Sequence, residues 1–202
     1  GAFTGMVMCA QFYIQFHKVK MDSAVMSVVS VAMCRELGAV LTALMVSGRV
    51  GAAMAAQLGT MKVTEQIDAL RTLATHPTDY LVAPRLLATF IALPLLTAEA
   101  IAIGMVSGMA VAVYLLGLDP VFLWRNMVYY TWSKDVLMGL IKAFIFAGII
   151  ATVSCYKGMN CGQGAEGVGR ATTQAVVTSS IIILVSNFFV TLILNKILIY
   201  SD

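Results

Sequence analysis

The chain is a series of long apolar runs separated by short polar segments. A helix that crosses a bilayer needs about 20 mainly apolar residues. The apolar runs predict five spanning helices, at about 1–16, 24–58, 86–116, 136–156 and 176–200. The sequence lacks the strict alternation over about ten residues that is typical of membrane β-strands. We therefore predict an all-α integral membrane protein in which residues 1–202 form one domain.

The first two apolar runs differ in length from an ordinary span. Residues 1–16 are too few, and the sequence does not begin with Met, so we expect an incomplete first span and a missing natural N-terminus. The second run exceeds one crossing, so its helix is tilted or projects into water. Small residues recur at every fourth position in three sets, Ser47/Gly51/Ala55, Gly48/Ala52/Ala56 and Gly104/Gly108. Such faces allow close packing of helices in lipid.

The longest polar segment, residues 59–85, predicts a short amphipathic helix over 64–75 outside the membrane. Thr64 is a suitable N-cap, and Glu65 and Asp68 suit the positive end of the helix dipole. Helical spacing puts four apolar residues on one face and leaves Asp68, Arg71 and Thr72 pointing elsewhere. The apolar face is Ile67, Leu70, Leu73 and Ala74. His76 and Pro77 end the helix.

Two further connections are predicted as loops. Residues 117–135 carry five aromatic residues, which often lie at the membrane–water boundary. Residues 157–175 are rich in glycine but lack a GK[ST] ending, so they form no nucleotide-binding loop. A flexible connector with close helix packing is the simpler interpretation.

The composition supports a membrane protein and excludes several activities. The chain is 60% hydrophobic and 11% charged, against about 25% charged residues in soluble domains. Its basic residues are scattered, which argues against nucleic-acid binding. The four cysteines form no CxxC pair and are interpreted as packing residues, so we expect no metal site. The two histidines lie in polar segments, and no HExxH or GxSxG motif indicates a hydrolase.

Four charged residues lie inside apolar runs: Arg35, Glu36, Glu99 and Lys142. Ionisable groups in a bilayer usually face a bundle interior or a wet cavity. We expect Glu36 to pair with Lys142, and Arg35 to face a cavity or a lipid headgroup. Two interpretations stay open. The charges belong to a transport path, or they form an ion network that only determines helix packing.

The sequence resembles the MlaE family of lipid-transport permeases. The resemblance rests on CRELGAVLTALMVSGRVGAAMAAQLGTMKVTEQIDAL at 34–70, DYLVAPRLLA at 79–88 and GAEGVGRATTQAVV at 164–177. It extends in order over essentially the whole chain. It implies five membrane helices, a homodimer with a lipid cavity, cytoplasmic ABC ATPases, and a ring of MCE-domain substrate-binding proteins on the periplasmic side.

The resemblance also assigns roles to particular residues. The family's coupling helix corresponds to 64–75, with Thr64, Glu65, Ile67, Asp68, Leu70 and Arg71, which places 59–85 and 157–175 in the cytoplasm. The cavity and intramembrane positions are Arg35, Glu36, Lys142, Tyr13 and Asn187. Three positions depart from the family pattern, Ala39 for Pro, Gln57 for Glu and Asn187 for Asp. We hypothesise that an inward-facing Glu99 replaces the charge lost at Asn187.

The expected function is that of a non-catalytic permease in the bacterial inner membrane, with the plastid inner envelope as the less favoured location. It moves phospholipid or a related lipid between that membrane and an MCE-domain partner, maintaining outer-membrane lipid asymmetry. The chain itself needs no cofactor, since a partner ATPase binds ATP and Mg. The alternative is an ion-coupled secondary carrier that uses Glu36, Glu99 and Lys142, although the sequence shows no inverted repeat.

Overall fold

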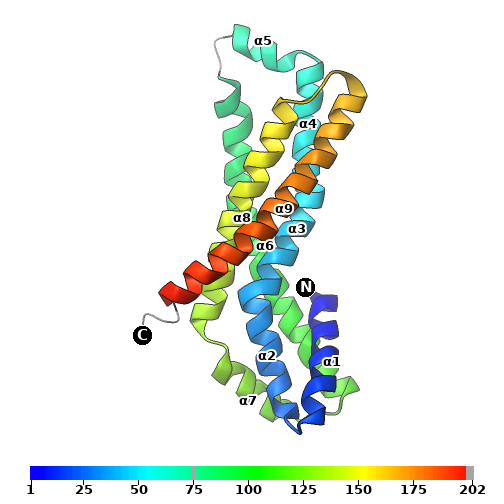
Figure 1. The fold of residues 1–202 in the computed structure, drawn as a ribbon, viewed down its shortest axis with the longest axis vertical. Coiled ribbons are helices and arrows are strands. Elements are labelled where there is room, and N and C mark those ends of the chain that lie inside the picture. Colours follow the sequence, from blue (N-terminus) through cyan, green and yellow to red (C-terminus); the bar gives the residue numbers. More distant parts are fainter. Residues whose placement is uncertain (74–75, 199–202) are drawn as a thin grey trace. The chain divides into compact units, whose positions relative to one another are not determined.

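The computed structural model describes residues 1–73 and 76–198, and within them the chain is helical and contains no β-strand (Figure 1). In chain order the helices are α1 (Ala2–Lys18), η1 (Asp22–Ala24), α2 (Val25–Ala32), η2 (Met33–Leu37), α3 (Gly38–Val46), η3 (Ser47–Gly51), α4 (Ala52–Val63), α5 (Gln66–Thr72), η4 (Thr78–Val82), α6 (Ala83–Ala110), η5 (Val111–Leu115), α7 (Pro120–Tyr130), α8 (Ser133–Met159) and α9 (Gly164–Leu198). The segment η1 is a 3₁₀ helix, and η2 to η5 are π-helical.

Four helical segments in the described part of the chain are long and apolar enough to cross a membrane. They are Asp22–Val63, Thr78–Leu115, Ser133–Met159 and Gly164–Ile197. The predicted all-helical membrane fold is therefore confirmed. Helix α1 covers the first predicted run, but its 17 residues are fewer than the roughly 20 that a span needs. The count of five spans stays a prediction, and residues 199–200 of the last one lie outside the described residues.

Two segments predicted as loops are largely helical. In 117–135, Asp119 caps α7 by accepting a hydrogen bond from the Val121 amide at 2.9 Å, and Pro120 occupies the first turn. This start signal outweighs the aromatic run that follows it. In 157–175, α8 continues to Met159 and α9 begins at Gly164. Glycine costs only about 1 kcal/mol in a helix, so a glycine-rich segment remains helical when packing favours it.

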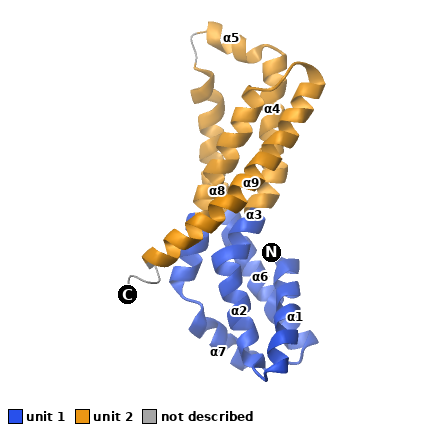
Figure 2. Cartoon of the chain, viewed as in Figure 1, with its two compact units in different colours: residues 1–42, 94–141 blue, residues 43–93, 142–202 orange. Residues whose placement is uncertain are grey.

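The helices form two compact units (Figure 2). Unit 1 comprises residues 1–42 and 94–141, and unit 2 comprises residues 43–93 and 142–202. The boundaries between the units fall within the helical segments Asp22–Val63 and Thr78–Leu115 and within α8. Each unit therefore has its own core.

Unit 1 is held together by glycine contacts and by a methionine-rich core. The backbone of α1 at Gly5 lies directly against that of α6 at Gly104, and a Cβ added at Gly108 would lie 3.2 Å from the Gly5 carbonyl oxygen. The predicted close-packing face at Gly104 and Gly108 is confirmed. The Ser107 hydroxyl donates to the Ala2 carbonyl at 2.8 Å across the same contact. The core comprises Cys9, Val25, Met26, Val29, Met33, Ala112, Leu123 and Met127.

In unit 2, α4 packs against α9. Of the two small-residue faces predicted between residues 47 and 56, one packs closely against another helix. A Cβ at Gly51 would lie 2.9 Å from the Ser154 hydroxyl, and one at Gly158 would lie 2.9 Å from the Ala55 carbonyl oxygen. The face Ser47/Gly51/Ala55 therefore meets α8. At the other face, Gly48 is exposed and has no atom within 4 Å of an added Cβ. The difference arises because helix rotation turns only one stripe toward α8.

Gly5, which lies against the α6 backbone, and Gly48, which is exposed, provide a matched test of the packing. We expect Gly5→Ala to destabilise the protein by about 1–3 kcal/mol, because its methyl group must displace the α6 backbone. Gly48→Ala should be neutral or stabilise by up to about 1 kcal/mol, because the helix gains propensity without a clash. Thermal unfolding in detergent measures both. A Gly5→Ala variant that melts with the parent protein would refute the close contact.

Candidate functional site

The intramembrane cation of unit 1, Arg35, lies in the π-helical segment η2 and forms an ion pair with Asp135. Arg35 Nε donates to Asp135 Oδ1 at 2.6 Å, and the Asp135 side chain is 2% exposed against 34% for Arg35. Asp135 is the last residue of the predicted loop 117–135, and the sequence predicts no role for it. The sequence did not anticipate this buried carboxylate, which meets the charge of Arg35. The expectation that Arg35 also faces a cavity or a headgroup stays a prediction.

Asp135 is held in place by the start of α8. Its second oxygen, Oδ2, accepts the Trp132 amide at 2.9 Å, which is the reciprocal half of a capping box. A neighbouring polar contact joins the hydroxyls of Ser30 and Thr131 at 2.6 Å, while the Ser30 hydroxyl donates to the Ser27 carbonyl. The Asp135 carboxylate thus caps α8 and also binds Arg35, so it connects η2 directly to the beginning of α8.

Close backbone contacts surround Arg35. The Cα of Gly139 on α8 faces the Cys34 carbonyl so closely that a side chain would collide with it. Gly38 similarly faces the Ile101 side chain on α6. Cys34 itself is buried and free, as expected for a packing residue. The π-helical turn is therefore confined between two helices, and such turns are frequent at functional sites.

The intramembrane cation of unit 2, Lys142, is completely buried. Its ammonium donates to the Thr191 hydroxyl at 2.7 Å, and that hydroxyl donates to the Asn187 carbonyl, also at 2.7 Å. The sequence singled out Lys142 and Asn187, and the structure brings them together through Thr191, one helical turn beyond Asn187 on α9. A lysine is rarely buried without paired groups, and the Thr191 hydroxyl is one group that meets this charge.

Other predicted site residues lie elsewhere. Glu99 is exposed on α6 of unit 1, and the hypothesis that it replaces a charge at Asn187 of unit 2 stays a prediction. Glu36 is half-buried in η2 of unit 1, and its proposed pairing with Lys142 of unit 2 stays a prediction. Tyr13 is half-buried on α1 beside the unit 1 core, with its ring 5.1 Å from that of His17. Its role as a cavity residue also stays a prediction.

The predicted amphipathic helix is present as α5, from Gln66 to Thr72, but it starts differently. Thr64 is not its N-cap, because it ends α4 and its hydroxyl donates to the Thr60 carbonyl at 2.9 Å. Glu65 precedes α5 in the left-handed conformation, with φ 58°. This sharp turn separates the two helices, and Thr64 instead satisfies the end of the earlier one.

One face of α5 is anchored and the other is open. Ile67 is buried with Met54, Leu58 and Leu81, and Leu70 packs partly against this cluster. Leu73 is 74% exposed, so it does not share the predicted face, and Ala74 lies outside the described residues. Asp68 and Arg71 form an exposed ion pair at 2.9 Å.

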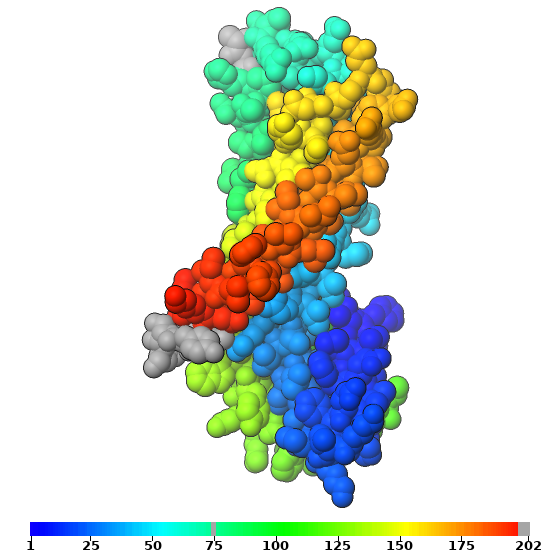
Figure 3. Space-filling view, viewed as in Figure 1, coloured from blue at the N-terminus to red at the C-terminus, as the bar shows by residue number. Residues whose placement is uncertain are grey.

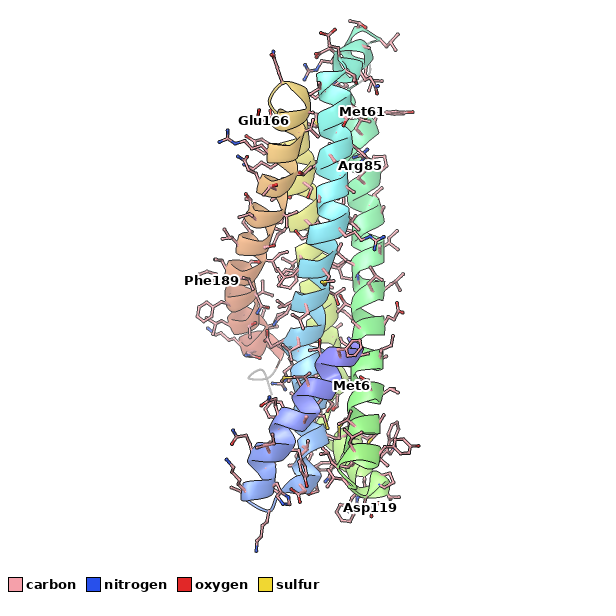
Figure 4. All side chains as sticks on the ribbon, turned by 90° about the vertical axis from the view of Figure 1, so that its right-hand side faces the viewer. Met6, Met61, Arg85, Asp119, Glu166 and Phe189 are labelled. Atoms are coloured by element: carbon pink, nitrogen blue, oxygen red, sulfur yellow. The ribbon has the colours of Figure 1, made fainter. Side chains whose placement is uncertain are left out.

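A basic side chain from α6 ties the helices beside α5 together. Arg85, labelled in Figure 4, donates from Nη1 to the Met54 carbonyl on α4 at 3.2 Å. Met61, labelled nearby on α4, packs against the same apolar cluster that buries Ile67. The apolar cluster against which α5 packs is built from residues of α4, η4 and α8 in unit 2, and Arg85 of α6 is bonded to the same α4.

The chain matches the family described as Permease MlaE over residues 1–193. The protein belongs to the MlaE permease family. All the site residues above fall within the matched range, and the resemblance inferred from the sequence is confirmed. With its apolar helices, the protein is a multi-pass membrane permease.

Individual relatives span bacteria and a plant. A probable ABC transporter permease protein of Rickettsia felis is 46% identical over 195 residues, which cover 96% of this chain and 75% of the relative. The intermembrane phospholipid transport system permease protein MlaE of Haemophilus influenzae is 37% identical over the same shares. The chloroplast protein TRIGALACTOSYLDIACYLGLYCEROL 1 of Arabidopsis thaliana is 38% identical, over 92% of this chain and 53% of its own length.

The ion pair of this MlaE-family chain can be tested with two aspartates that both accept an amide at a helix start. Asp135→Asn keeps the size of the side chain but removes the charge facing Arg35, and should cost about 1–3 kcal/mol, less than for a wholly buried pair. Asp119→Asn should be nearly neutral, because Asn caps equally well. Thermal unfolding of both variants measures the difference. Equal shifts would show that the ion pair contributes nothing beyond capping.

Proposed function

We propose that this protein is the membrane-spanning subunit of an ATP-driven ABC transporter that moves phospholipids, or related lipids, between the inner membrane and an MCE-domain partner. The observation that carries the proposal is the match to the MlaE permease family over residues 1–193. It is supported by relatives whose names specify ABC transport and, in Haemophilus influenzae, intermembrane phospholipid transport. Such transport would maintain outer-membrane lipid asymmetry.

The positions of the two intramembrane cations suit a lipid cargo. A two-chain amphiphile needs apolar walls for its tails and a cation for its phosphate. Arg35 keeps a third of its side chain exposed beside Asp135, and Lys142 lies wholly within apolar helices. Each cation donates a hydrogen bond to a neighbouring element of its own unit, so each side chain is oriented before a lipid binds.

Energy must come from another subunit, because the sequence has no nucleotide-binding motif. We propose that α5 is the coupling helix, with Ile67 as its anchor and with Asp68, Arg71 and Leu73 facing a cytoplasmic ATPase. The burial of Ile67 beside exposed charges supports this role. Because Ile67 anchors α5 to the helices of unit 2 while its other face is exposed, a movement of a bound ATPase would be passed through α5 to those helices.

The outer face of α9 favours a homodimer with a lipid cavity. Its inner stripe, Ala171, Ala175, Ser179 and Ile183, is buried at every fourth position. Beyond Ser180 the helix also exposes large apolar residues, including Ile181, Val185, Phe188 and Phe189. Part of α9 faces the viewer in Figure 3. Such a surface suits lipid or a second copy of the chain. We place the complex in the bacterial inner membrane, with the plastid envelope as the alternative.

The test of this function is purification of the full-length protein from native membranes, followed by mass spectrometry of bound proteins and lipids. We expect an ABC ATPase, an MCE-domain protein and two-chain phospholipid. A complex that carries sterol would keep the mechanism and change the cargo. A protein that purifies without an ATPase, and whose transport follows the proton gradient, would overturn the proposal in favour of an ion-coupled carrier.

Coupling through α5 predicts a specific defect. Arg71→Glu should weaken ATPase binding about tenfold, since it reverses a charge on the proposed docking face. Folding should be nearly unaffected, because exposed ion pairs contribute about 0.3–0.5 kcal/mol. Co-purified ATPase and thermal unfolding measure the two effects. Lys20→Glu, an exposed reversal in unit 1, is the control, and equal ATPase loss in both variants would argue against docking at α5.

A further inference from the structure

Helix α7 has one face firmly bound to the core of unit 1. Leu123 and Met127 are buried with Met26 and Val29 of α2. The side-chain amide of Asn126 donates to the Ser23 carbonyl at 3.1 Å, beside the start of α2. The orientation of α7 about its own axis is thereby determined, and so is the face that it presents outward.

The outward face of α7 is also apolar. Val121, Trp124, Arg125, Val128 and Tyr129 follow the spacing of a single helical face, and Trp124 is 61% exposed. With Met109 of α6 and Pro120, they line a groove of about 730 Å³. This volume lies within the range of roughly 300–1,000 Å³ for ligand sites. A helix that is apolar on both faces needs a covering that is not water.

Arg125 gives the groove its chemical selectivity. It is the single charged residue among those that line the groove in the described structure. Its guanidinium carbon lies 5.2 Å from the centre of the Phe122 ring, which steadies the side chain by a cation–π contact. Trp and Tyr beside it are typical of the membrane–water boundary. Apolar walls that carry one cation match a lipid tail that ends at an anionic headgroup.

We propose that this groove is a selective binding site for an anionic phospholipid, with an acyl chain along Val121, Trp124 and Val128 and the headgroup on Arg125. The inference rests on the proposed lipid transport and adds a site distinct from Arg35 and Lys142. An apolar partner helix would leave Arg125 without a counter-charge. A water-soluble anion would leave the apolar walls uncovered.

The two tryptophans of the sequence, Trp124 and Trp132, allow a direct test. Trp132 is equally exposed, at 61%, but does not line the groove. Full-length protein with Trp124 as its sole tryptophan, and a matched protein with Trp132 alone, are reconstituted in phosphatidylcholine vesicles. Each receives brominated phosphatidylglycerol or brominated phosphatidylcholine at the same mole fractions. Quenching of fluorescence then reports which lipid lies against each ring.

We expect Trp124 to be quenched at about fivefold lower mole fraction by the anionic lipid, corresponding to one basic residue near the surface. Trp132 should show no preference. Arg125→Gln should abolish the preference, and Arg125→Lys should retain it. Equal quenching of Trp124 by both lipids would overturn the proposal. Protection of Trp124 from both lipids in the complete complex would also overturn it, since a protein would then cover the groove.

Transport and ATPase co-purification are measured on the same preparations. Lost selectivity at Trp124 with normal lipid transport would refute the groove and leave the proposed function intact. Retained selectivity without an ATPase or lipid transport would refute the function and leave the groove as a lipid site.

Discussion

A charge placed among apolar helices must be met by a partner, and this requirement organises the candidate site in each unit. Removing a charge from water costs several kcal/mol unless hydrogen bonds and an opposite charge compensate it. In unit 1, Asp135 meets Arg35 and also caps α8. In unit 2, Lys142 binds the Thr191 hydroxyl on α9. The helix ends and neighbours are therefore positioned by the charges that the proposed transport needs, so stability and function depend on the same contacts.

Close backbone packing makes these contacts possible. In lipid, helices associate through van der Waals contact between small residues, because the tails around them are as apolar as the side chains. Gly139 brings α8 against the Cys34 carbonyl, one residue before Arg35. Gly5 and Gly104 bring α1 against α6 in the same unit. A short distance between helix axes allows the short Asp135 side chain to reach Arg35, which a wider spacing would prevent.

Much of the fold could be predicted from the sequence. The errors arose where helix caps, packing or a single backbone conformation determined the structure. Apolar length predicted the long helices, and small-residue spacing predicted the Gly104/Gly108 contact. The predicted loops failed at α7 and at the start of α9, where local capping and packing outweigh residue propensity. Thr64 was assigned to the wrong helix because a positive φ at Glu65 is not encoded by any obvious residue type. Asp135 was recognisable only as an acid three residues after Trp132, at the N3 position of a capping box.

The sequence by itself determined that this is an all-helical membrane protein of the MlaE permease family, because apolar run length and contiguous motifs are local properties of the chain. It also identified Arg35 and Lys142, since a charge in an apolar run is visible without a structure. Only the tertiary structure decided which groups meet those charges, which small-residue face packs, and that α7 presents an apolar groove beside Arg125. The contacts of Arg35 and Lys142 join residues 100 and 49 positions apart. Such contacts depend on how the helices pack and rotate, which no local run of residues specifies.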